Sequence, residues 1–194
     1  MLRTTSTFLL VFALGVSLTT SAKGAELISN GGFETDDFTG WTVEGIPSNL
    51  FEVTDFWGHT GTHSAVFAGL EGDNDRISQV APMTSGQQYV LDFWVNNGSD
   101  GNHGVGGDGL AVFWEGAPAL NISPFPAQVN TWLNYTLNVT ATSNGSELKF
   151  HGFDAPFAIY LDDISLVAMM PEPNALLLLA VGMTGVAMRS RCRR

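Results

Sequence analysis

The stretch Tyr89-Val90-Leu91-Asp92-Phe93-Trp94-Val95-Asn96 alternates between two kinds of side chain. Successive side chains of a β-strand point to opposite faces, so this pattern predicts a strand with one buried side. The side chains predicted to face the core are Tyr89, Leu91, Phe93 and Val95. The opposite side is predicted to be polar and to carry a tryptophan.

Two later stretches repeat this alternation. Along 132–140, the residues predicted to face inward are Leu133, Tyr135, Leu137 and Val139, and Trp132 and Asn134 are among those that face outward. Along 147–153, Leu148 and Phe150 are predicted to face inward, with Lys149 and His151 outward. A sheet with one apolar and one polar face is typical of a half-solvated sandwich layer.

Between residues 25 and 168, short apolar stretches rich in β-branched and aromatic residues are separated by Gly, Asn, Asp and Pro turns, and helix signals are absent. The pattern predicts one all-β domain, an antiparallel β-sandwich or barrel. The predicted strands are 26–29, 41–45, 50–54, 64–68, 76–81, 87–96, 109–115, 131–140, 147–153 and 157–168.

The charge of this central part is strongly negative. Residues 25–170 contain eighteen acidic side chains and only two basic ones, Arg76 and Lys149, a formal charge of −16 with histidines neutral. Such a surface repels nucleic acid and anionic lipid, and it suits a neutral ligand, a divalent cation or simple solubility. The only cysteine is Cys192, so the central part cannot form an internal disulfide.

The N-terminal residues 1–24 have the pattern of a signal peptide. One cationic residue, Arg3, precedes an apolar stretch from Phe8 to Leu18, and the small residues Ala22 and Gly24 follow it. This order predicts cleavage by signal peptidase after Gly24, with Ala22 as the alternative position. The central part is therefore expected to be exported.

The C-terminal segment 169–194 combines Pro171-Glu172-Pro173, an apolar run over 175–188, and the basic residues Arg189, Arg191, Arg193 and Arg194. Fourteen helical residues rise only ~21 Å, whereas a hydrocarbon core is ~30 Å thick. The run is thus a marginal membrane anchor, with its arginines expected on the cytoplasmic side. The alternative is an amphipathic helix docked on the domain, but only Thr184 interrupts the apolar run.

This tail resembles the PEP-CTERM sorting signal of Gram-negative bacteria. The resemblance implies recognition and cleavage at Pro171-Glu172-Pro173 by an exosortase. It further implies export across the inner membrane, transient anchoring through the apolar helix, and delivery to the cell surface or extracellular matrix.

The central part resembles the galactose-binding-like jelly roll of carbohydrate-binding modules of the family 4/9/22 type. The resemblance rests on Leu27 to Glu34 (LISNGGFE), Gly40-Trp41, Gly61 to Ala65 (GTHSA), Gly86 to Tyr89 (GQQY) and Tyr160 to Leu166 (YLDDISL). It covers residues 25–168 and implies a jelly-roll sandwich that binds a carbohydrate, such as an exopolysaccharide. The Asn30-Gly31-Gly32 segment is expected to supply positive φ angles at a tight turn or bulge.

Asp162 is predicted to be a buried carboxylate. Steps of two along 160–166 place it on the same side as Ile164 and Leu166, and an isolated buried charge is costly. Because basic partners are scarce, Ca²⁺ held by Glu34 and Asp162, with carbonyl oxygens of 62–64, is one expectation. The resembling modules often carry a structural calcium between their first and last strands. Capping of Asp162 by backbone N–H groups is the alternative.

The polar sheet face is the predicted ligand site. Trp94 and Trp114 are expected to stack on sugar rings, and the residues expected to hydrogen-bond hydroxyl groups are Asp92, Asn96, Asn134 and Lys149. The alternative is that these aromatic side chains pack under the second sheet or beneath a loop.

No constellation of nucleophile, base and acid is evident, so the chain is not expected to be an enzyme. Two other functions remain open. One is a matrix or adhesion protein without a specific glycan. The weaker one is an ice-binding surface, which needs a regular threonine array that Thr136 and Thr140 alone are too sparse to provide.

Overall fold

The computed structural model describes residues 24–44, 50–69, 75–98, 108–125, 130–154 and 157–169. These ranges form ten β-strands and contain no helix. Accordingly, none of the residues described offers a helix long and apolar enough to cross a membrane. The predicted signal peptide and sorting segment lie outside the described residues, apart from Gly24 and Met169.

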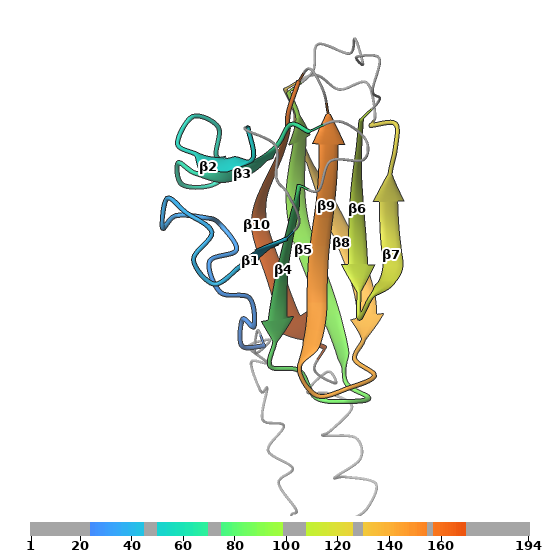
Figure 1. The fold of residues 1–194 in the computed structure, drawn as a ribbon. Helices are drawn as coiled ribbons and strands as arrows, with labels where there is room; N and C mark the ends of the chain where they lie inside the picture. The colour runs from blue at the N-terminus through green and yellow to red at the C-terminus, as the bar shows by residue number, and fades with distance from the viewer. Residues whose placement is uncertain are drawn as a thin grey trace, which may run out of the picture. The chain divides into compact units, whose positions relative to one another are not determined.

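The strands form two antiparallel five-stranded sheets that pack face to face (Figure 1). The first sheet has the order β1 (Thr42–Glu44), β4 (Arg76–Ala81), β9 (Ser146–Asp154), β6 (Asp108–Trp114) and β7 (Ala117–Ile122). The second has the order β2 (Glu52–Thr54), β3 (Ser64–Phe67), β10 (Ile159–Ala168), β5 (Gln88–Asn97) and β8 (Trp132–Thr140). The predicted all-β antiparallel sandwich is confirmed.

Nine of the ten predicted strands are present, with bounds that differ by up to two residues. Residues 26–29 are the exception, because they make only one isolated bridge, Glu26 to Val167. Strand β7 was not predicted, since Pro118 interrupts an otherwise short pattern and four of its residues are exposed. As an edge strand it tolerates the proline. It follows β6 through Glu115 and Gly116, which both have positive φ, as a tight hairpin turn requires.

The core lies between the sheets, where the predicted inward faces meet. Tyr89, Leu91, Phe93 and Val95 are all at least 97% buried, and Leu148 and Phe150 oppose them from β9. Trp41 also belongs to this core. The alternation in the sequence therefore predicted the buried face of these central strands correctly.

The opening segment differs from its prediction in detail. Positive φ angles occur at Asn30 (51°) and Phe33 (55°), and neither Gly31 nor Gly32 has one. Gly31 is instead required by a close approach, because a methyl group on it would lie 2.0 Å from the carbonyl oxygen of Ile164. The N–H of Ile164 also donates to the carbonyl of Gly31 at 2.9 Å. The segment is thus fastened directly onto β10.

Strand β10 contains a bulge at this point of attachment. Asp162 pairs with Trp94 and Ser165 pairs with Asp92, so two residues of β10 face one residue of β5. Asp163 has a φ of 49° in the bulge. The bulge changes the alternation, and the prediction that Asp162 shares the core face with Ile164 is therefore wrong. Asp162 lies on the outer face with Trp94, although it is fully buried there.

Candidate functional site

The outer face of the second sheet carries a cavity of about 490 Å³ over β10, β5 and β8. Its walls combine apolar and hydrogen-bonding side chains, and the residues that line it are Val90, Asp92, Trp94, Asn134, Asp163, Ser165 and Val167. Three of these, Asp92, Trp94 and Asn134, are predicted ligand-binding residues. The structure therefore brings half of the predicted ligand site together in one cavity.

Asp92 and Asn134 are held in fixed positions by a small polar network. Trp94 pairs with Asn134 and Asp92 with Thr136 across the β5–β8 ladder. The amide of Asn134 donates to Asp92 Oδ1, and Thr136 Oγ1 lies 3.3 Å from Asp92 Oδ2. Because these contacts join neighbouring strands, the polar groups are oriented before any ligand arrives.

Trp94 borders the cavity but is partly covered. The imidazole of His59 stacks on it with 3.9 Å between ring centroids and an angle of 15°. His59 also meets Trp132 edge-on at 5.5 Å. One indole face is thus occupied by the loop between β2 and β3, and the rest of the side chain lines the cavity. One predicted alternative was that the aromatic side chains lie beneath a loop, and this is the case for one face of Trp94.

The same loop is held in place by Asp162 and Asp163. The N–H groups of His59 and Thr60 donate to Asp162 Oδ2 at 2.7 and 3.3 Å. His59 Nδ1 lies 2.6 Å from Asp163 Oδ2. Burial raises the pKa of Asp162 to about 7, although N–H donors, first that of Asp163, oppose the rise. Backbone N–H groups therefore cap the Asp162 carboxylate, as the alternative to a bound cation predicted.

Glu34 holds the loop further along. Its Oε1 accepts the N–H groups of His63 and Thr62, each at 2.9 Å. These bonds, that of His63 above all, keep the pKa of the Glu34 carboxyl below its ordinary value. Gly61 lies against this carboxylate with a φ of 66°, and a methyl group on it would be 2.3 Å from Oε1. The predicted metal ligands Glu34 and Asp162 thus both fasten one loop.

Three acidic residues surround Gly32, and their arrangement decides how Ca²⁺ could fit between them. A methyl group built at Gly32 would lie 3.6 Å from Asp163 Oδ1, 3.7 Å from Asp162 Oδ1 and 4.0 Å from Cγ of Glu34. The missing side chain of Gly32 therefore leaves a cradle bounded by three acidic residues. No group of three or more His, Cys, Asp or Glu side chains within the described part is arranged to hold a metal by itself. Backbone carbonyls are needed to complete the shell, and they are ordinary Ca²⁺ ligands.

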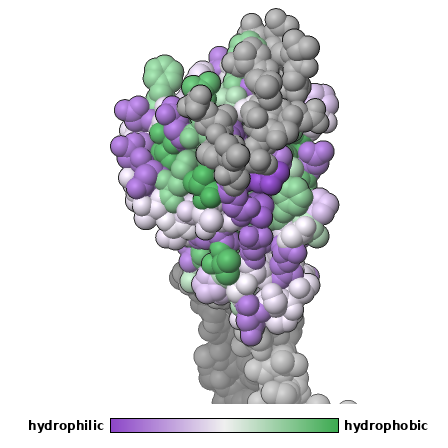
Figure 2. All heavy atoms as spheres, viewed as in Figure 1, coloured by the Kyte–Doolittle hydropathy of each residue, from purple (hydrophilic) through white to green (hydrophobic). Residues whose placement is uncertain are grey.

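Two predicted ligand residues, Trp114 and Lys149, lie on the other sheet. Trp114 belongs to the core of the first sheet, and its indole N–H donates to the carbonyl of Thr140 at 3.0 Å. Lys149 faces outward on that same sheet, where it pairs with Glu44 at 2.9 Å and Glu147 at 3.6 Å. Figure 2 views this side of the sandwich and shows hydrophilic residues along its middle. The placement of Trp114 and Lys149 beside Trp94 is therefore wrong.

Asn96 is on the predicted face but is inaccessible. It pairs with Tyr160 on one side and Trp132 on the other, and it is fully buried. Neither atom of its side-chain amide has a hydrogen-bond partner within the part of the chain that the structure describes. The prediction that Asn96 contacts a ligand from an open surface is not supported, because the side chain has no exposed atom.

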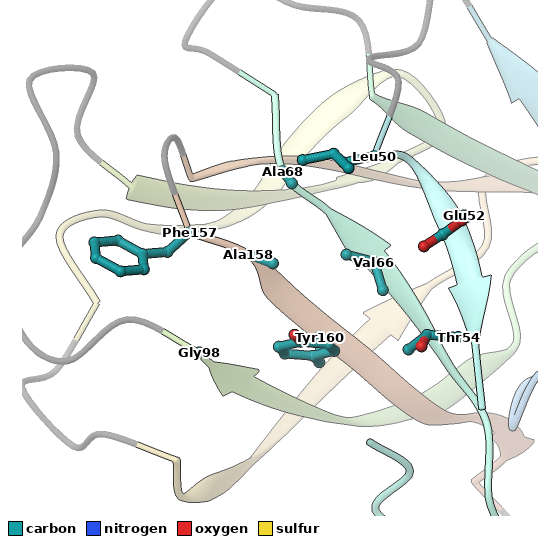
Figure 3. Close-up of a pocket in the computed structure, with 9 residues that line it drawn as sticks. All are labelled: Leu50, Glu52, Thr54, Val66, Ala68, Gly98, Phe157, Ala158 and Tyr160. Carbon is teal, nitrogen blue, oxygen red and sulfur yellow. The ribbon is translucent and has the colours of Figure 1, made fainter. Parts of the chain in front are cut away.

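A second cavity, of about 310 Å³, lies on the same sheet face (Figure 3). Glu52 and Thr54 of β2, Val66 of β3 and Tyr160 of β10 contribute to its wall, and Phe157 points away from them. Between the two cavities, Trp57 packs on Tyr160 with 5.1 Å between centroids, and His59 packs on Trp94. The β2–β3 loop therefore divides this face into two compartments.

Sequence reasoning missed several residues of the site. Asp163 and Ser165 line the cavity because of the bulge in β10, and no pattern in the sequence predicted that bulge. His59 comes from a loop that is distant in sequence from Trp94, so only strand order could reveal the contact. The available signal was the adjacent pair Asp162 and Asp163, of which only Asp162 was predicted to belong to a site.

Solved structures with the same fold include several carbohydrate-binding modules. A family 61 module in complex with β-1,4-galactotriose has a TM-score of 0.58 and 18% identity, covering 75% of this chain and 99% of that one. A family 16 module has a TM-score of 0.51 and 19% identity, covering 73% and 99%. The family 22 xylan-binding domain of Paenibacillus barcinonensis Xyn10C has a TM-score of 0.52 and 18% identity, covering 78% and 99%.

At such low identity, this similarity shows the fold alone: the chain contains a jelly-roll sandwich like that of carbohydrate-binding modules. No family model matches the sequence. No curated protein matches it either.

Proposed function

We propose that the sandwich is a non-catalytic glycan-binding module and that the cavity beside Trp94 is its binding site. The observation that carries this proposal is the joint presence in that cavity of an indole and of the oriented polar groups of Asp92, Asn134 and Ser165. Aromatic surface supplies affinity for the apolar face of a sugar ring, and polar side chains orient its hydroxyl groups.

The size of the cavity and the named neighbours support this proposal. About 490 Å³ falls within the range of ordinary small-ligand pockets and accommodates a short oligosaccharide. One structural neighbour is described in complex with β-1,4-galactotriose, and another is described as a xylan-binding domain. Some neighbours are modules attached to enzymes, such as the family 22 module beside a family 10 glycoside hydrolase catalytic module. A binding role without catalysis agrees with that arrangement.

A glycan screen tests the proposal. The purified chain should bind at least one class of oligosaccharide on an array, and isothermal titration calorimetry should give saturable binding with one site. An exopolysaccharide extracted from the producing cells belongs in the same screen. If no oligosaccharide or polysaccharide binds above background, the glycan-binding proposal is wrong.

A matrix or adhesion role without a specific glycan is the second candidate. Two exposed apolar side chains favour it, namely Phe56 at 81% exposure and Leu50 at 58%. One structural neighbour is an adhesin domain of Lys-gingipain from Porphyromonas gingivalis, with 17% identity, a TM-score of 0.53 and coverage of 75% of this chain and 97% of that one. Retention by protein-coated surfaces without any glycan binding would favour this candidate. The outer row of β8 offers only Thr136 and Thr140 as threonines, which disfavours ice binding.

We also propose that Ca²⁺ binds between Glu34 and Asp162 and stabilises the attachment of the β2–β3 loop. The charge and the oxygen donors at the Gly32 cradle support it, and both basic residues of the domain lie on the other sheet. A ligand at a hundred times its dissociation constant adds ~2.7 kcal/mol of stability. For a domain of this size, this corresponds to a Tm increase of roughly 5–10 °C.

Differential scanning calorimetry with Ca²⁺, with Mg²⁺ and with EGTA measures this effect. Asp162→Asn should remove the shift caused by Ca²⁺, and Glu147→Gln, on the far sheet, should retain it. A melting temperature that is the same with Ca²⁺ and with EGTA would contradict the calcium proposal.

The ends of the chain support a further part of the proposed function, which is export and sorting. We propose that residues 1–24 direct export across the inner membrane and that 169–194, through Pro171-Glu172-Pro173 and the terminal arginines, direct exosortase processing. The domain would then reach the cell surface or matrix. Mass spectrometry of the protein from its native cells should find a chain that lacks both ends.

A further inference from the structure

The cavity beside Trp94 has an unusual charge for a sugar site. Asp92 and Asp163 line it, and no other described residue of its wall is basic. The only two basic residues within 25–170 are Arg76 and Lys149, in β4 and β9 of the other sheet. A glycan that enters this cavity therefore meets the negative charge of Asp92, whereas the charge of Asp163 is engaged by His59.

The charge of Asp92 is not neutralised by its partners. The two side chains that hydrogen-bond to its carboxylate, Asn134 and Thr136, are both neutral. Asn134 Nδ2 uses one site on the carboxylate, and Thr136 also lies 3.1 Å from Asn134 Oδ1. A carboxylate has about four lone-pair sites, so acceptor capacity remains for a donor from a ligand.

The surroundings increase the electrostatic attraction that the Asp92 carboxylate exerts on a cationic ligand. Eighteen acidic side chains against two basic ones give the domain a field that attracts cations and repels anions. Asp92 is half-buried beside Trp94, Val90 and Val167, and apolar walls reduce screening by water and salt. Anionic glycans such as polyuronates are disfavoured here, whereas a glycan with positive charge gains an interaction that a neutral sugar lacks.

We infer that the cavity recognises a glycan that carries free amino groups, with the ammonium of a hexosamine ring directed to Asp92. The inference rests on the proposed function of the same cavity and specifies its ligand class. An ammonium group has three N–H donors and no acceptor, which matches a wall built from a carboxylate, the Oδ1 of Asn134 and the Oγ of Ser165. N-acetylation removes the charge from the sugar nitrogen and adds bulk, so it should weaken binding.

The test compares three pentasaccharides by isothermal titration calorimetry at 150 mM NaCl, at a pH below the pKa of the sugar amine. The first is β-1,4-linked glucosamine, the second its N-acetylated form, and the third a hexuronate. The purified full chain should bind the amino form at least tenfold more tightly than the N-acetylated form and should not bind the hexuronate. Asp92→Asn keeps the shape of the side chain and should reduce the tenfold preference to less than threefold.

Glu52→Gln is the matched control, because it removes the same charge from the same sheet face but in the second cavity (Figure 3). It should retain the preference. Equal affinities for the amino and N-acetylated forms would overturn the inference but leave glycan binding intact. A preference that falls equally in both variants would overturn it too, because attraction by the net charge alone would then explain the preference. Absence of binding by these and all other glycans would refute the proposed function itself.

Discussion

Replacing Trp94 by alanine is expected to reduce the affinity for a bound oligosaccharide about thirtyfold. Among the described residues that line the cavity, Trp94 is the only one with an aromatic side chain. Tryptophan anchors in binding sites commonly contribute ~2 kcal/mol or more when truncated, which corresponds to this factor. Because Trp94 is half-buried on the outer face, its loss should have only a modest effect on the folded core. The measurement is titration calorimetry with the tightest oligosaccharide from the glycan screen.

Trp57 provides the control for this substitution. It is a half-buried tryptophan on the same sheet face, but it packs on Tyr160 and does not line the cavity beside Trp94. Trp57→Ala should keep the affinity within threefold of the wild type, and Trp94→Phe should recover part of what Trp94→Ala loses. If Trp94→Ala binds as tightly as the unmodified chain while both melt at similar temperatures, the ligand lies elsewhere.

The stacking of His59 on Trp94 limits how a ligand can reach the indole. One face of the indole is already covered by an imidazole at 3.9 Å, in the manner in which a sugar ring would cover it. A ligand therefore either uses the remaining surface of Trp94 or displaces the β2–β3 loop. Displacement would break the hydrogen bonds from this loop to Asp162 and Asp163, so it would carry a free-energy cost.

Alternation along the strands predicted which side chains are buried, since burial on one side leaves a direct record in the sequence. It succeeded for Phe93 and Phe150, which occupy the centre of the core. It could not place Lys149 correctly, because an outward direction does not tell which of two sheets a strand joins. The strand orders follow from contacts between residues that are distant along the chain, and no local pattern contains them.

The predictions for Trp114 and Asp162 were wrong for two other reasons. In β6, apolar residues occupy both sides, so Trp114 had no polar neighbours to show that its own side is the core. In β10, the bulge shifts the alternation between Asp162 and Ser165, so counting by two assigned Asp162 to the wrong face. A bulge depends on its surroundings, here on the attachment of Gly31 to Ile164.

That attachment leads to the largest stability effect that we expect, for Gly31→Ala. The added methyl group would lie 2.0 Å from the carbonyl oxygen of Ile164, and backbone atoms cannot move aside as a flexible side chain can. Overpacking costs ~1–3 kcal/mol and occasionally more, and a clash with backbone should reach the upper end. The Tm should fall by roughly 6–12 °C for ~3 kcal/mol.

Gly32→Ala is the control for Gly31→Ala, because the two residues are adjacent and neither has a positive φ. A methyl group on Gly32 makes only ordinary contacts, the shortest at 3.6 Å from Asp163 Oδ1. Measured by calorimetry in EGTA, Gly32→Ala should melt within ~2 °C of the unmodified chain, whereas Gly31→Ala should melt far lower. Equal melting temperatures for the two variants would mean that the opening segment does not press against β10. The close approach of Gly31 to Ile164 would then not explain the bulge that places Asp162 and Asp163 on the outer face.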